Sequence, residues 1–181
     1  MRIYVDLDET LIANDVDPWS GIVRRIYARP GAHEFLSHLQ SYGQVWLLTR
    51  AEMGHVDRAL QKLGDAAELL KGIISREDLT TIYDQVEAIL EAPISDTSKL
   101  GLLSRVKPLF PRGIIFDNDE PYSDSYWIKT KAVGVGFDQW IEVDPFTVEG
   151  PDLGGLERAF SKFLSCCAGR PMQLSGVHAY A

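Results

Sequence analysis

Short apolar runs alternate along the chain with longer segments whose apolar residues follow helical spacing. Residues 79–90, for example, carry apolar side chains at positions 79, 82, 83, 86 and 90, which fits one face of a helix. Such alternation predicts an α/β fold with a mostly parallel sheet and helices on both faces. The expected strands are 3–5, 45–48, 72–74, 114–116 and 132–135, and the expected helices are 30–42, 51–63, 79–90, 99–106 and 154–164. We expect an irregular loop, with Pro18 and Gly21, between the first strand and the first helix.

The length and composition suit one compact domain. The 181 residues are 45% hydrophobic, enough to form a single core, and we expect a domain over 1–165 and a mobile tail over 166–181. The net charge of −8, with no basic stretch to offset it, argues against nucleic-acid and anionic-membrane partners. Adjacent Cys166 and Cys167 make a poor structural disulfide, and the chain begins directly with a strand rather than a signal peptide, so we expect a cytoplasmic protein.

The first strand leads into a pair of carboxylates. Asp6 follows the apolar run at 3–5, Asp8 comes two residues later, and Thr10 follows. In an open α/β fold this places both carboxylates at the carboxyl edge of the sheet, where ligands bind. Two like charges so close repel, so the site needs either a cation or a proton. The pattern predicts an aspartyl nucleophile beside an acid/base aspartate, although an acidic turn after a strand fits it equally well.

Two later strands end in polar residues of complementary chemistry. Thr49 follows the strand at 45–48, and Asp117 and Asn118 follow the strand at 114–116, with Lys99 between them in the sequence. This motif order resembles that of the haloacid dehalogenase (HAD)-like phosphohydrolase superfamily. Segments 6–11 (DLDETL), 29–36 (RPGAHEFL) and 117–118 resemble more specifically the NIF branch, which includes phosphatases of the RNA polymerase II C-terminal tail. The resemblance covers about residues 2–137.

The resemblance implies a fold, a reaction and a set of catalytic roles. The fold would be a HAD-like Rossmannoid three-layer sandwich, and the reaction a phosphomonoester hydrolysis through an aspartyl-phosphate. Asp6 would be the nucleophile and Asp8 the general acid and base, with Thr49 and Lys99 holding the phosphoryl oxygens. Lys107 competes with Lys99 for the cationic role.

The same resemblance implies a metal cofactor and substrate contacts. Mg²⁺ would be held by Asp6, the backbone carbonyl of Asp8, Asn118 and Asp117, an all-oxygen set of the kind that this ion prefers. Thr10 would fix the loop or touch the phosphate. Arg50 would contact an anionic part of the substrate, and a solvated surface arginine is an equally good interpretation of that residue.

The intervals between the motifs leave no room for a large cap domain. Residues 11–29 can hold only a loop and a flap, and residues 50–98 are filled by two helices and a strand. An open, capless site favours phosphoproteins as the substrate by family analogy. The alternatives are a small-molecule phosphatase for nucleotides or sugar phosphates, a polynucleotide-end phosphatase, and a non-catalytic binding module. The sequence does not determine the oligomeric state.

Overall fold

A five-stranded parallel sheet forms the centre of the computed structural model, which describes residues 1–150, 152 and 154–168. The strand order is β5-β4-β1-β6-β7, and every neighbouring pair is parallel. The strands are β1 (Arg2–Val5), β4 (Gln44–Leu48), β5 (Gly72–Ile74), β6 (Ile114–Asp117) and β7 (Trp140–Glu142). β1 is therefore the central strand, and its carboxyl end lies between those of β4 and β6.

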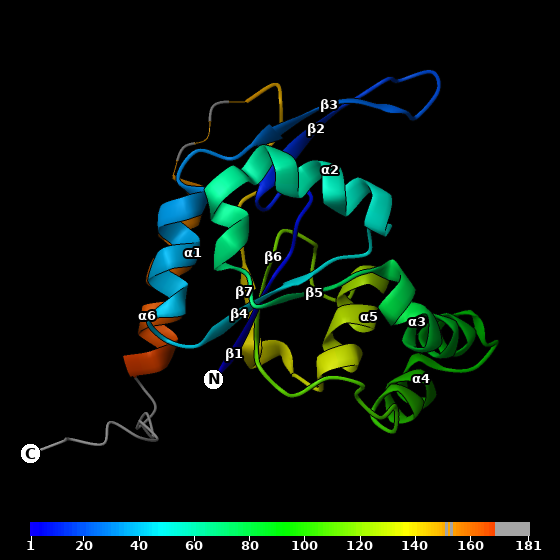
Figure 1. Cartoon of the computed structure of the whole chain (residues 1–181). Helices are drawn as coiled ribbons and strands as arrows, with labels where there is room; N and C mark the ends of the chain where they lie inside the picture. Colours follow the sequence, from blue (N-terminus) through cyan, green and yellow to red (C-terminus); the bar gives the residue numbers. More distant parts are fainter. Residues whose placement is uncertain (151, 153, 169–181) are drawn as a thin grey trace, which may run out of the picture.

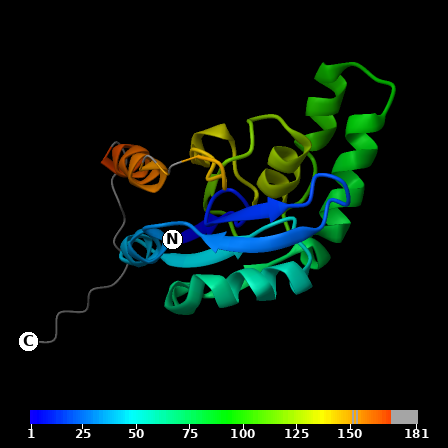
Figure 2. The ribbon, with the colours of Figure 1, turned by 90° about the horizontal axis from the view of Figure 1, so that it is seen from above.

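Helices cover both faces of this sheet (Figures 1 and 2). Ile3 and Val5 of β1 face one core cluster, and Tyr4, between them, faces the other, because successive side chains of a strand point to opposite faces. The first cluster is closed by α1 (Ala32–Gln40), α2 (Met53–Leu63) and α6 (Gly155–Ala168), and the second by α3 (Arg76–Glu91), α4 (Asp96–Leu103) and α5 (Asp124–Val133). The three-layer α/β sandwich expected from the sequence is confirmed.

The segment after β1 is an antiparallel hairpin rather than an irregular loop. β2 (Ile12–Val16) pairs with β3 (Val23–Ala28), and the hairpin extends beyond the carboxyl end of the sheet (Figure 1). The turn is stabilised by the Asp17 side chain, which accepts hydrogen bonds from the backbone N–H groups of Trp19 and Ser20. Gly21 completes the turn with a φ of 68°, a conformation that glycine adopts without strain.

The last strand of the sheet lies later in the chain than expected. The apolar run at 132–135 ends helix α5, and the fifth strand is β7. Ala132 and Val133 are fully buried as the last turn of that helix, and Gly134, with a φ of 62°, terminates it. A four-residue apolar run does not distinguish a buried strand from a buried helix end by its periodicity.

Helix α6 packs against the core that the sheet forms with α1. Phe163 is fully buried and lies against Phe116 of β6, with the two ring centroids 5.6 Å apart. The helix continues to Ala168, so residues 166–168 of the expected mobile tail are helical and residues 169–181 lie outside the described part. Among the described residues, every helix is too short or too polar to cross a lipid bilayer.

Candidate functional site

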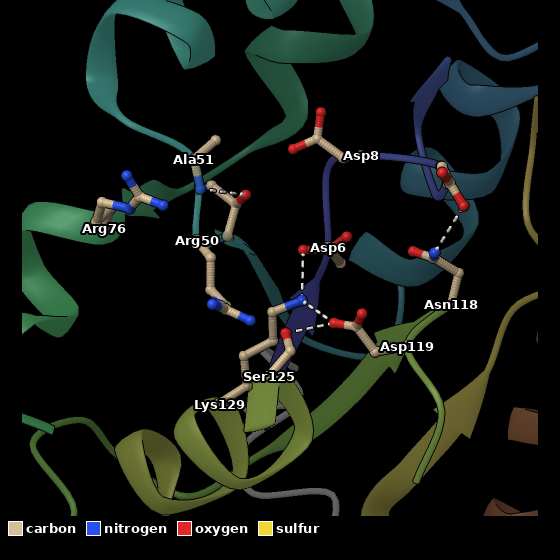
Figure 3. Close-up of a pocket in the computed structure, with 11 residues that line it drawn as sticks. Asp6, Asp8, Arg50, Ala51, Arg76, Asn118, Asp119, Ser125 and Lys129 are labelled. Carbon is tan, nitrogen blue, oxygen red and sulfur yellow. Dashed lines mark hydrogen bonds and ion pairs between the residues drawn. The ribbon is translucent and has the colours of Figure 1, made fainter. Parts of the chain in front are cut away.

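The strand-end residues of the sequence motifs meet at the carboxyl edge of the sheet. Asp6 follows β1, Thr49 follows β4 and Asp117 ends β6, and these three strands are neighbours. A pocket of about 360 Å³ opens above this edge (Figure 3), within the roughly 300–1,000 Å³ usual for ligand sites. It is lined by Asp6, Asp8, Glu9, Thr49, Arg50, Ala51, Arg76, Asn118, Asp119, Ser125 and Lys129.

A buried lysine that the sequence motifs did not identify lies at the base of this pocket. Lys129 of α5 donates hydrogen bonds to Asp6 Oδ1 at 2.8 Å, Asp117 Oδ2 at 2.6 Å and Asp119 Oδ2 at 2.9 Å. Ser125 lies one helical turn earlier on the same face and donates to Asp119. One ammonium group thus links acidic residues at the carboxyl ends of two neighbouring strands, β1 and β6.

The surroundings of this cluster raise the pKa values of two of its carboxyl groups and of its lysine. Burial raises the pKa of Asp6 to about 6, although the charge of Lys129 works against that rise. Burial likewise raises the pKa of Asp117 well above its usual range. Burial alone would lower the pKa of Lys129, but the charges of Asp117, Asp6 and Asp119 outweigh it and the net pKa is raised. The lysine therefore stays charged, whereas burial favours the protonated forms of Asp6 and Asp117.

Asp8 lies on the rim of the pocket and is oriented by two side chains. Its Oδ1 atom is 2.8 Å from His55 Nε2 of α2 and accepts a hydrogen bond from Asn14 Nδ2 of β2 at 2.5 Å. Glu9, directly after it, has a φ of 58°, a left-handed conformation that turns the chain back toward the hairpin. The Asp8 side chain remains 36% exposed, so it can still reach a bound substrate.

Thr10 stabilises the loop rather than lining the pocket. It is fully buried, and its hydroxyl donates to Asn118 Oδ1 at 2.9 Å. Asn118 in turn donates from Nδ2 to Glu9 Oε2 at 3.3 Å. These two bonds fasten the loop after β1 to the loop after β6, so of the two roles expected for Thr10 the geometry favours loop fixing.

Thr49 and Arg50 both line the pocket. Thr49 is 1% exposed, and its Oγ1 atom accepts a hydrogen bond from the Ala51 backbone N–H at 3.1 Å. The same hydroxyl can still donate its proton to a ligand oxygen. The Arg50 guanidinium lies 5.7 Å from the centre of the Tyr83 ring.

The structure does not place Lys99 at this pocket. Lys99 belongs to α4, and its ammonium donates to the Leu90 carbonyl near the end of α3. The competing Lys107 is exposed in the segment between α4 and β6 and does not line the pocket either. The expectation for Lys99 is thus corrected, because the cation beside the carboxylates comes from Lys129, on the helix after β6 instead of the helix before it.

The oxygen-rich edge fits Mg²⁺ by the chemistry of its donors. Asp6, Asp8, Asn118 and Asp119 line one pocket, and their carboxylate and amide groups are oxygen donors of the kind that Mg²⁺ prefers. Asp117, the remaining expected ligand, is fully buried and directed at Lys129 and the Asp119 backbone N–H. Within the described ranges, no three acidic, histidine or cysteine side chains are already arranged around a metal position. The carboxylates are arranged around the Lys129 ammonium instead.

Comparison with known proteins places this site in a family. A search of curated proteins found no match. The family model described as NLI interacting factor-like phosphatase matches residues 2–144, which contain every side chain that lines the pocket. The matched segment spans all seven strands and the helices α1 to α5. The chain therefore belongs to the NLI interacting factor-like phosphatase family.

Proposed function

We propose that this protein is a Mg²⁺-dependent phosphomonoesterase that forms an aspartyl-phosphate on Asp6, with phosphorylated proteins as the leading substrate class. The observation that carries the proposal is the position of the Asp6 carboxylate. It lies at the floor of the pocket, is fixed by Lys129 through Oδ1, and receives no hydrogen bond from any described residue at Oδ2. The second oxygen is therefore free to attack phosphorus.

The contacts of the neighbouring residues support a catalytic role for each of them. Asp8 would protonate the leaving oxygen and then take a proton from the hydrolytic water, with His55 and Asn14 holding its carboxylate in one orientation. The Thr49 hydroxyl would donate to a phosphoryl oxygen. Lys129 would offset the negative charge that a phosphate brings to an acidic pocket.

Mg²⁺ would be held by Asp6, the Asp8 backbone carbonyl, Asn118 and one of the two acidic residues that flank Asn118. When bound, it supplies positive charge that reduces repulsion between these carboxylates and the phosphate. A new cation would compete with Lys129 for Asp6, which is one of three carboxylates sharing that ammonium.

The open pocket supports a large substrate. Between β1 and α1 the structure has only the hairpin, and between β4 and β6 it has only helices and the edge strand β5. No separate cap domain is present among the described residues, so a phosphorylated side chain of a protein can approach the pocket. A small-molecule phosphatase is the second candidate, favoured by the two arginines on the pocket wall.

The proposal is tested by turnover of an aryl phosphate with and without Mg²⁺. Asp6→Asn should lower kcat by at least about a thousandfold, because an amide is not a nucleophile. Asp65→Asn, in the short helix η1 (Gly64–Leu69) and exposed, is the matched control and should retain activity. Chelation should also abolish turnover of the wild type. Appreciable turnover by folded Asp6→Asn protein, or full activity in chelator, would contradict the proposal.

A further inference from the structure

We infer that Arg50 and Arg76 form a binding site for a second anionic group, a phosphate or carboxylate, carried by the leaving portion of the substrate. This inference rests on the proposed phosphatase function and narrows its substrate class. Both arginines line the pocket that contains Asp6. In Figure 3 both lie on the side of the pocket opposite Asn118, with the Arg50 side chain directed toward Ser125 and Lys129 and the Arg76 side chain farther out.

The two backbone segments that carry the arginines are hydrogen-bonded to each other. Arg50 follows β4 and Arg76 begins α3, directly after β5. The Thr49 backbone N–H donates to the Ile74 carbonyl, and the Arg76 backbone N–H donates to the Ala51 carbonyl, each at 3.0 Å. These bonds fix the two backbone segments relative to each other, so both arginines are kept at the same pocket.

The positive charge of these arginines is available to a ligand. Lys129, the other cation of the pocket, is already shared by three carboxylates. Arg50 forms no salt bridge with a described residue, and its guanidinium lies 5.7 Å from the centre of the Tyr83 ring. Arg76 pairs with Glu52 at 3.1 Å, but both side chains are more than half exposed, so that pair is weak and can be exchanged for a bound anion.

The positions of Arg50 and Arg76 suit contact with the leaving group of the substrate better than contact with the phosphoryl group that is transferred. Asp6 and Thr49, which would contact the transferred phosphoryl group, are 4% and 1% exposed at the floor of the pocket. Arg50 is half-buried and Arg76 is exposed, so they lie toward the mouth. In an in-line displacement the leaving group departs on the side away from the nucleophile, which is the mouth of this pocket. Guanidinium groups there would bind an anion on the departing fragment.

The experiment compares kcat/KM for phenyl phosphate and 3-carboxyphenyl phosphate, which differ in the charge of the leaving group. The wild type should prefer the carboxylated substrate about tenfold, the scale of a charge-assisted hydrogen-bonded pair. Arg50→Gln and Arg76→Gln should each bring this ratio close to one. Arg58→Gln, which removes an exposed arginine of α2 outside this pocket, should preserve the ratio. The ratio of kcat/KM for two substrates, measured on one enzyme preparation, does not depend on the fraction of protein that is active.

Two further substrate comparisons identify the class of molecule that carries the second anionic group. One compares phosphoserine peptides with glutamate or glutamine after the phosphoserine, and the other compares a sugar bisphosphate with its monophosphate. Preference in the peptide arm supports an acidic phosphoprotein, and preference in the sugar arm supports a small bisphosphate.

Specific outcomes would overturn the inference. They are a wild-type ratio near one in every arm, or equal losses on both aryl phosphates in the arginine variants. If Asp6→Asn abolishes turnover but the wild type shows no preference, this inference alone fails. If Asp6→Asn remains active, the proposed function fails with it.

Discussion

The Lys129 ammonium lies within 2.9 Å of oxygens from Asp6, Asp117 and Asp119. The buried carboxylates of this cluster repel one another, and removing the buried charge of Lys129 leaves them without that compensation. We therefore expect Lys129 to stabilise the fold and to hold Asp6, the proposed nucleophile, in place. Lys99, at the surface of α4, satisfies only a backbone carbonyl.

A pair of methionine variants distinguishes these two lysines. At pH 7.5, Lys129→Met should lower the free energy of unfolding by about 3–5 kcal/mol, and Lys99→Met by about 1 kcal/mol, measured by urea denaturation. Turnover of an aryl phosphate should fall at least about a hundredfold in Lys129→Met and less than about threefold in Lys99→Met. The reverse order of the two variants would contradict the assignment of the functional cation to Lys129.

The stability loss of Lys129→Met should shrink in acid. The pKa of Asp6 is raised in the fold from 3.8 to about 6, and a raised carboxyl pKa means that folding is favoured when the group is protonated. Without Lys129 this pKa rises further, so the contribution of Asp6 to the penalty grows as the pH rises through 6 and is smaller below it. Denaturation of both proteins at pH 5 and 7.5 measures the difference, and an equal penalty at both values would contradict the electrostatic explanation.

At the scale of elements, a buried ion pair of Arg29, directly after β3, joins the end of the hairpin to the segment before α6. Arg29 donates to both carboxylate oxygens of Asp152, at 2.7 and 2.9 Å, and also to the Thr10 carbonyl at 3.1 Å. The two side chains are only 1% and 9% exposed. Gly155 must lack a side chain here, because a Cβ atom would lie 2.1 Å from the Arg29 guanidinium.

Asp152→Asn should lower the free energy of unfolding by about 3 kcal/mol at neutral pH, since it leaves the Arg29 charge buried without its partner. The hydrogen bond from Arg29 lowers the pKa of Asp152 below 3.8, so this contribution is present above that pH and is lost as the pH falls through the lower folded value. The control is Asp144→Asn, because Asp144 and Arg158 form a pair about half exposed and worth less than about 1 kcal/mol. Similar losses from both variants would contradict the account.

The elements that the sequence predicted well are those with a strong local signal. Four of the five expected strands are observed, because each is an apolar run followed by a polar residue at the same sheet edge. The hairpin was missed because only one residue of β3, Ile26, is buried, so no alternating pattern marks that strand.

The role of Lys129 at the site was missed for a different reason. Its place beside Asp6 depends on how α5 packs on the sheet, although the i, i+4 spacing of Ser125 and Lys129 was a usable signal.

At the scale of the whole molecule, the site is assembled from loops that follow different strands and is closed by α5. The hairpin contributes Asn14, and α2 contributes His55, both to Asp8. Helix α6 lies outside the segment matched by the family model but buries Phe163 in the same core as β1. We propose that residues 1–168 fold as one unit, because the core that supports the site extends into this last helix.

The most direct test of the account is to locate the covalent intermediate. Wild-type protein should be mixed with Mg²⁺ and a fast aryl phosphate, quenched, reduced with borohydride and analysed by peptide mass spectrometry. An acyl phosphate is reduced to an alcohol, so the account predicts homoserine at position 6 in the wild type and none in a reaction without substrate. Steady turnover with no modification at position 6, or with phosphate on His55 instead, would contradict the assignment of Asp6 as the nucleophile.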